Sequence, residues 1–91
     1  MQYLIAYDIE NTKNRTKLFE KLKDFGLKPV QKSLFYGELS NAEKLSVKIF
    51  LKKYCLDGDK AIITAVSLKM EDTIGYEKDD FTKKEFEILW F

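Results

Sequence analysis

Residues 3–9 read YLIAYDI, a short run rich in Tyr, Leu and Ile that is typical of a buried β-strand. One acid, Asp8, lies near the C-terminal end of this predicted strand, which spans residues 2–9. Burying an ionised carboxylate is costly unless a hydrogen bond, a cation or a metal compensates it. Asp8 therefore has two interpretations: it caps the turn that follows, or it belongs to a functional site.

The segment after this strand is predicted to form a basic amphipathic helix. Apolar residues recur at helical spacing over residues 13–25, and Asn11 or Thr12 is suited to cap the helix. Gly26 is placed to end it in a left-handed conformation, and Pro29 prevents its resumption.

Residues 30–39 are predicted to be extended, either as one long strand bent at Gly37 or as a strand followed by a short one. Ser40 and Glu43 have the spacing of a capping box, which predicts a helix over residues 40–54. Its core-facing stripe is expected to contain Ala42, Leu45, Val47, Ile49, Phe50, Leu51 and Tyr54.

Residues 60–68, KAIITAVSL, have a clear β pattern, which completes the order β-α-β(β)-α-β. Two helices interleaved with strands must cover one face of a sheet to bury their apolar stripes. The sequence therefore predicts an α+β fold of the ferredoxin-like, split βαβ type. We expect residues 1–91 to form one such domain, with residues 69–91 as a C-terminal extension.

The extension ends on FEILWF, residues 86–91, which would be a sticky patch if it stayed in water. We predict that it forms an extra strand, paired either with its own sheet or with that of a second copy of the chain. A chain of 91 residues has a modest core, which favours exchange within a homodimer.

The amino-acid composition limits the catalytic groups that this chain can use. The chain has no His and one Cys, so it lacks the commonest general base and zinc ligand, and no disulfide can form within it. Any catalysis must use carboxylates, hydroxyls, Lys or Arg, or a hard cation held by oxygen. No apolar run is long enough to span a bilayer and no signal peptide opens the sequence, so we expect a cytoplasmic protein without membrane contact.

The net charge of +1 hides an uneven distribution. Residues 11–32 contain seven Lys or Arg against two acids, whereas residues 1–10 carry two acids and no base. A basic segment beside a strand-end acid suits a phosphate-bearing partner, although charge alone favours an ordinary solvated helix face. The candidate nucleic-acid contacts are Lys13, Arg15, Lys17, Lys21, Lys28 and Lys32.

Three motifs occur in a characteristic order: YDI at residues 7–9, R-x-K at residues 15–17, and Gly26 followed by Q-x-S-x-F at residues 31–35. In this order they resemble the Cas-two family, the small CRISPR-associated proteins of spacer acquisition. The resemblance extends over nearly the whole chain. Pro29 stands where several members carry a basic residue, so any phosphate binding by that residue must come from Lys28 or Lys32 or be absent. This departure weakens the case for nuclease activity more than that for duplex binding.

The resemblance implies a ferredoxin-like homodimer in which the last strand of each protomer joins the partner's sheet. It also implies a Mg²⁺ or Mn²⁺ ion at the dimer interface, held by Asp8 of both copies, with Asp8 as the catalytic residue of members that cleave RNA or DNA. The more general role implied is structural, because such a dimer bridges the CRISPR integrase partner and holds double-stranded DNA.

Three further residues are candidates for supporting roles. Ser33 is expected to donate a hydrogen bond near the interface, since no His is present to activate it as a nucleophile. Phe35 and Tyr7 are interpreted as core or interface residues, with base stacking as the alternative if they are exposed.

Three other functions fit the same sequence. A toxin-type, metal-dependent endoribonuclease would share the fold and the acid. A non-catalytic regulatory dimer would bind a small molecule at its interface. A single-strand RNA-binding domain of related topology would need exposed aromatic residues on the face of its sheet.

Overall fold

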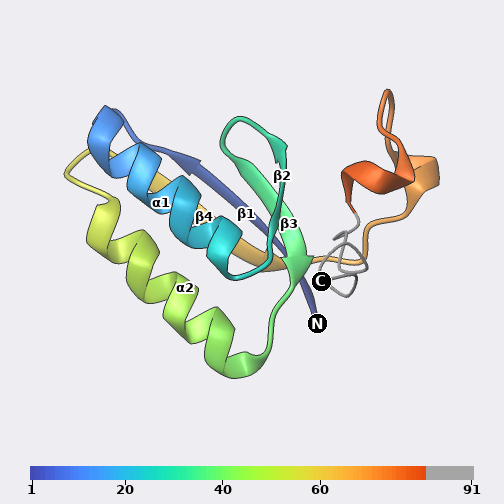
Figure 1. The fold of residues 1–91 in the computed structure, drawn as a ribbon, viewed down its shortest axis with the longest axis horizontal. Helices are drawn as coiled ribbons and strands as arrows, with labels where there is room; N and C mark the ends of the chain where they lie inside the picture. Colours follow the sequence, from blue (N-terminus) through green and yellow to red (C-terminus); the bar gives the residue numbers. More distant parts are fainter. Residues whose placement is uncertain (82–91) are drawn as a thin grey trace, which may run out of the picture.

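The computed structural model describes residues 1–81 of the chain. Its elements alternate as predicted, which confirms the β-α-β-β-α-β order and the ferredoxin-like fold (Figure 1). They are β1 (Gln2–Asp8), α1 (Thr12–Asp24), β2 (Lys28–Gln31), β3 (Leu34–Glu38), α2 (Asn41–Tyr54) and β4 (Lys60–Ala65), followed by the 3₁₀ turns η1 (Met70–Asp72) and η2 (Lys78–Asp80).

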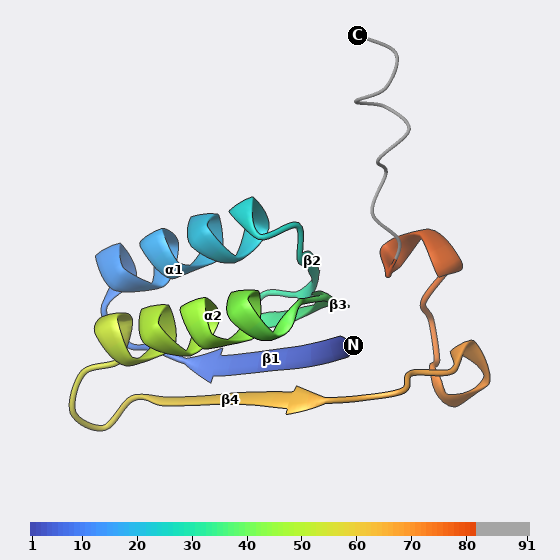
Figure 2. The same cartoon turned by 90° about the horizontal axis from the view of Figure 1, so that it is seen from below.

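The four strands form one antiparallel sheet in the order β2-β3-β1-β4. The first strand is central, so Ile5 lies opposite Phe35 on one side and Ile63 on the other. Both helices lie on the same face of this sheet (Figure 2). The other face carries no α-helix within residues 1–81.

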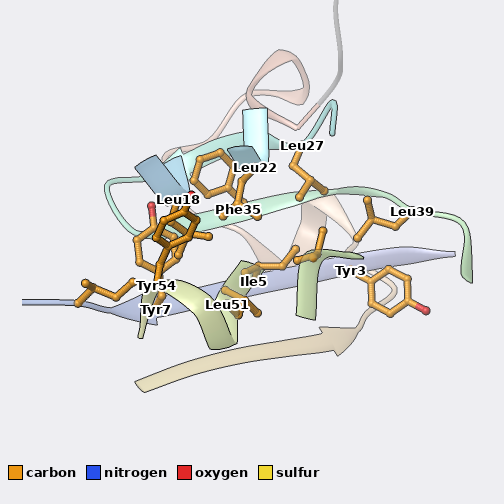
Figure 3. Close-up of a cluster of buried hydrophobic side chains, with 12 residues drawn as sticks. Tyr3, Ile5, Tyr7, Leu18, Leu22, Leu27, Phe35, Leu39, Leu51 and Tyr54 are labelled. Atoms are coloured by element: carbon orange, nitrogen blue, oxygen red, sulfur yellow. The ribbon is translucent and has the colours of Figure 1, made fainter. Parts of the chain in front are cut away.

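The core lies between the helices and the sheet (Figure 3). Alternate residues of β1 point into it because successive strand side chains face opposite ways. Ile5 and Phe35 are fully buried at its centre, beneath Leu18 and Leu22 of α1 and Val47 of α2. The regularly spaced apolar residues of the strands and helices thus pack together in one continuous core.

The helix ends confirm the predicted caps. Asn11 caps α1, since its side chain accepts a hydrogen bond from the backbone N–H of Asn14 at 2.9 Å. Gly26 follows the helix with φ 82°, a left-handed conformation that favours glycine. Ser40 and Glu43 form the reciprocal capping box of α2, at 3.1 and 2.8 Å.

Residues 30–39 form two strands rather than one bent strand, because a hairpin turn occurs at Lys32 and Ser33. The bend predicted at Gly37 is wrong, since this residue lies inside β3. Space beside this glycine is tight: a Cβ would lie 3.0 Å from Leu27 Cδ2 and 3.3 Å from Leu27 Cα. The α1–β2 connection therefore packs directly on the strand.

The predicted core stripe of α2 was too wide. Leu45 and Ile49 are 60% and 64% exposed, whereas Val47 and Leu51 are buried. Each residue advances about 100° around a helix, which places Leu45 and Ile49 on the side opposite the core. The strand predicted at residues 60–68 also ends earlier, at Ala65.

Residues 66–81 lie against the β2–β3 end of the sheet. The side-chain amide of Gln31 donates to the Tyr76 hydroxyl at 2.6 Å, and the Tyr36 and Phe81 rings meet edge to face at 5.6 Å. The extra strand predicted at residues 86–91 lies outside the described residues.

Gly37→Ala is expected to lower the free energy of unfolding by about 1–2 kcal/mol. Overpacking against Leu27 costs roughly 1–3 kcal/mol, and the smaller entropy of the unfolded chain offsets part of that. Urea unfolding measures the difference. Leu27→Ala combined with Gly37→Ala provides the control, because removing the opposing side chain should reduce the cost of the second change. An unchanged or higher midpoint for Gly37→Ala alone would contradict the close approach.

Candidate functional site

Asp8 is the last residue of β1, opposite Lys60 of β4, and its side chain is exposed. The carboxylate has no hydrogen-bond or ion-pair partner among residues 1–81. The Asp8 carboxylate of a single protomer therefore does not incur the free-energy cost of burying a charge. The capping interpretation is also wrong, because Asn11 caps the helix. Asp8 remains free to bind a ligand.

One protomer does not provide a complete metal site at Asp8. Within residues 1–81 no three His, Cys, Asp or Glu side chains are grouped so as to hold a metal ion. An exposed, unpartnered carboxylate is a suitable hard ligand for Mg²⁺ or Mn²⁺, but Mg²⁺ takes six oxygens. Asp8 therefore fits such an ion as one ligand, and further protein oxygens must come from elsewhere.

The loop after Asp8 is held by Arg15. Its guanidinium donates from Nη1 to the carbonyl oxygens of Ile9 at 2.9 Å and Glu10 at 3.4 Å, and from Nη2 to Thr12 Oγ1 at 3.3 Å. Arg15 thus shapes the β1–α1 loop, a role the sequence did not reveal.

Asp59 holds the same loop from the other side. Its carboxylate accepts hydrogen bonds from the backbone N–H of Glu10 at 3.2 Å and of Leu56 at 2.8 Å. These bonds join the β1–α1 loop to the α2–β4 loop. The backbone just beyond Asp8 is therefore fixed by two charged side chains that are distant in sequence.

Three of the six candidate cations share one flank of α1. Lys13, Lys17 and Lys21 are exposed, and each step of four residues rotates them by only about 40°. We call these three residues the lysine row. Lys21 Nζ lies 5.5 Å from the ring centroid of Phe50, which places the row on the α2 side of the helix. None of the three forms an ion pair within the described part of the chain.

The other three candidate cations lie elsewhere. Arg15 and Lys32 line a groove on the opposite side of α1, facing β2. Lys28 lies opposite Tyr36 in the β2–β3 ladder, and therefore on the sheet face away from the helices. The six cations predicted as nucleic-acid contacts do not form a single surface.

The candidate supporting residues are parts of the packed interior or its edge. Phe35 is fully buried and Tyr7 is 6% exposed, with their rings stacked at 6.3 Å, so burial excludes base stacking by either. Ser33 occupies the hairpin turn, where its carbonyl oxygen accepts a hydrogen bond from the Tyr7 N–H at 3.1 Å. The packing interpretation of the two aromatic residues is confirmed.

The helix-free face of the sheet does not resemble a base-stacking platform. In the strands, the aromatic residue on that face is Tyr36, which is only 6% exposed and packs against Phe81. This disfavours a single-strand RNA-binding domain, which needs open rings on its sheet. The centre of this face is instead aliphatic, with Leu4, Ala6 and Leu34 beside Ile62, which is 62% exposed.

The hydroxyl of Tyr7 is a buried side-chain polar atom that has no hydrogen-bond partner within residues 1–81. Burial raises the pKa of this phenol, and the nearby Arg15 guanidinium opposes that shift. The hydroxyl therefore remains protonated at neutral pH and is available as a neutral donor.

Comparison with known proteins identifies the family. The family model for CRISPR associated protein Cas2 matches residues 1–74. The chain belongs to the Cas2 family. The YDI strand end, the R-x-K helix start and the β2–β3 hairpin all lie inside the matched range. The resemblance inferred from these motifs is thereby confirmed.

Two curated Cas2 relatives cover most of the chain. It is 42% identical over 89 residues to the CRISPR-associated endoribonuclease Cas2 1 of Francisella tularensis subsp. novicida strain U112, which spans 94% of this chain and 90% of that protein. It is 35% identical over 82 residues to the CRISPR-associated endoribonuclease Cas2 of Korarchaeum cryptofilum strain OPF8, spanning 86% and 88% of the two chains.

Solved structures share the fold of this chain. Streptococcus pyogenes Cas2 at pH 6.5 superposes with a TM-score of 0.67 at 24% identity, covering 82% of this chain and all of that one. A hypothetical protein from Thermus thermophilus gives a TM-score of 0.69 at 26% identity, covering 82% of this chain and 90% of that one.

Within residues 1–81, no helix has the length and apolar character needed to cross a bilayer.

Proposed function

We propose that this Cas2 protein is the non-integrase subunit of a CRISPR spacer-acquisition complex and acts as a homodimer that binds duplex DNA. The lysine row carries the proposal. Its three exposed ammonium groups extend over ~12 Å of one helix flank and have no acidic partner among residues 1–81. Such a row suits the phosphate backbone, which is bound without regard to sequence. Family membership supports the CRISPR setting.

The helix-free face of the sheet supports a homodimer. Strand alternation places Leu4, Ala6 and Leu34 on this face together with the exposed Ile62. Aliphatic surface of this kind is stabilised when a second copy covers it. Asp8 lies at one end of the same face, so a two-fold axis there would bring two Asp8 carboxylates together. We include exchange of the residue 86–91 strand in this proposal.

A second candidate function is metal-dependent cleavage of RNA or DNA at the paired Asp8 carboxylates. The names of the curated relatives, both endoribonucleases, favour it. A bound Mg²⁺ or Mn²⁺ supplies Lewis-acid stabilisation of a phosphoryl oxygen and an activated water. Asp8 would hold the ion, Arg15 and Asp59 would fix the loop beside it, and the lysine row would bind the nucleic-acid backbone.

Duplex binding is tested with Lys17→Ala. In a homodimer this substitution removes two phosphate contacts, so the slope of log affinity against log salt should become shallower by about two. Affinity at moderate salt should fall roughly tenfold. Fluorescence anisotropy with a labelled DNA duplex of arbitrary sequence measures both the salt slope and the affinity.

Lys52→Ala is the matched control, because it removes the same charge from an exposed position on α2. Its effect should be small. Equal losses for Lys17→Ala and Lys52→Ala would show that only net charge matters, and would contradict a defined contact at the lysine row.

A further inference from the structure

We propose that the groove between α1 and β2 is a binding site for the phosphate monoester of a nucleotide. The groove has a volume of about 610 Å³, which is larger than a phosphate ion requires. Its walls come from the β2-facing side of α1 and from β2 with its hairpin turn. It lies on the side of α1 opposite to the lysine row, so it is distinct from the duplex contacts proposed above.

The charges around the groove favour a dianion. Arg15, Lys23 and Lys32 line it from the two ends of α1 and from the hairpin turn, and Glu20 is the acid beside them. The charged side chains that line the groove are therefore net positive. A phosphate monoester carries close to two negative charges at neutral pH, so the two charges are complementary. Lys23 Nζ is positioned 5.7 Å from the ring centroid of Phe19, at the wall of the groove.

A buried donor gives independent support. Tyr7 lines the groove, is more than nine-tenths buried, and has a hydroxyl without a partner in the described residues. A buried hydroxyl without a hydrogen bond costs about 1–3 kcal/mol, so most proteins avoid one. The hydroxyl oxygen is itself covered, so a phosphate oxygen in the groove would reach it only after a small shift of the Tyr7 ring, and the new hydrogen bond would then remove the cost.

The remaining wall favours a nucleoside as the rest of the ligand. Phe19 and the apolar residues of β2 provide a surface on which a base or sugar can pack. The choice of a nucleotide over another phosphate ester rests on the proposed nucleic-acid function. Two sources present this chemistry, a free mononucleotide and the phosphorylated end of a strand.

Calorimetric titration with adenosine 5′-monophosphate, and with adenosine alone, tests the site directly. The monophosphate should bind and the nucleoside should not, and at ten times Kd the ligand should raise Tm by several degrees. A short single strand with and without a 5′-phosphate distinguishes a strand end from a free nucleotide. Equal binding of phosphorylated and unphosphorylated forms in both pairs would overturn the proposal.

Lys23→Ala and Tyr7→Phe are the informative variants, because neither residue belongs to the lysine row. Each should weaken binding of the monophosphate roughly three- to tenfold while leaving duplex affinity unchanged. Lys48→Ala on α2 is the matched control and should leave monophosphate binding unchanged. Loss of duplex binding in Lys17→Ala with monophosphate binding retained separates the two proposals.

Tyr7→Phe also has a readout that does not depend on the ligand. Removing an unpartnered hydroxyl should leave the Tm of the free protein unchanged or raise it, whereas removing a bonded one lowers it. A lower Tm would show that the hydroxyl already has a partner, such as a buried water, and would remove the main support for the site.

Discussion

Phe35→Ala is expected to lower the free energy of unfolding by about 3–5 kcal/mol. The ring is fully buried at the centre of the core, stacked on Tyr7 at 6.3 Å and edge to face with Phe19 at 5.1 Å. Alanine would leave a cavity between the sheet and α1 that neighbouring side chains cannot fill. Because small domains have total stabilities of only about 5–15 kcal/mol, a large unfolded fraction should be visible by circular dichroism and urea titration.

Leu45→Ala is the control for this substitution, since Leu45 is 60% exposed on the outer side of α2. Its effect should stay within about 0.5 kcal/mol. Phe35→Leu should give an intermediate loss because most of the buried volume is kept. Similar stabilities for Phe35→Ala and Leu45→Ala would mean that the ring is not in the core as described.

Asp8→Asn is expected to lower any metal-dependent cleavage of RNA or DNA by at least about 100-fold, with duplex affinity nearly unchanged. The amide keeps the shape of the side chain but removes the charge that binds the ion. In a homodimer both copies change, so two ligands are weakened at once. Cleavage of labelled substrates in Mg²⁺ or Mn²⁺, with and without a chelator, provides the measurement.

Glu10→Gln is the matched control, because Glu10 is an exposed acid two residues further along the same loop. Its backbone N–H, rather than its carboxylate, makes the bond to Asp59. Cleavage should therefore persist. Undiminished cleavage by Asp8→Asn would exclude the paired-carboxylate site, whereas no cleavage by the parent protein under any metal would leave duplex binding as the function to test.

Local signals were sufficient for most of the fold. The Asn11 cap, the left-handed Gly26 and the Ser40–Glu43 capping box involve residues at most a few positions apart, and all were confirmed. The short apolar run at residues 3–9 was also sufficient to predict β1. The YDI, R-x-K and Q-x-S-x-F motifs were likewise sufficient to indicate the Cas2 family.

The predictions that failed concern contacts between distant residues. Gly37 suggested a bend, but it is a strand residue that leaves space for Leu27. Leu45 and Ile49 looked like core residues because an apolar residue does not specify which side of its helix a sheet will cover. The capping interpretation of Asp8 also failed, because the side chain of Asn11 rather than the Asp8 carboxylate caps α1.

The positions of the basic residues show most clearly what the sequence determines and what the fold decides. The sequence located a basic segment at residues 11–32, and that composition needs no fold to be recognised. Folding then separated its cations, with the lysine row on one flank of α1 and Arg15, Lys23 and Lys32 around a groove on the other. It also bonded Arg15 to the carbonyl oxygen of Ile9 and placed Asp59 beside Glu10. Short-range periodicity dictates which elements form, whereas the packing of helices on a sheet dictates which side chains share a surface.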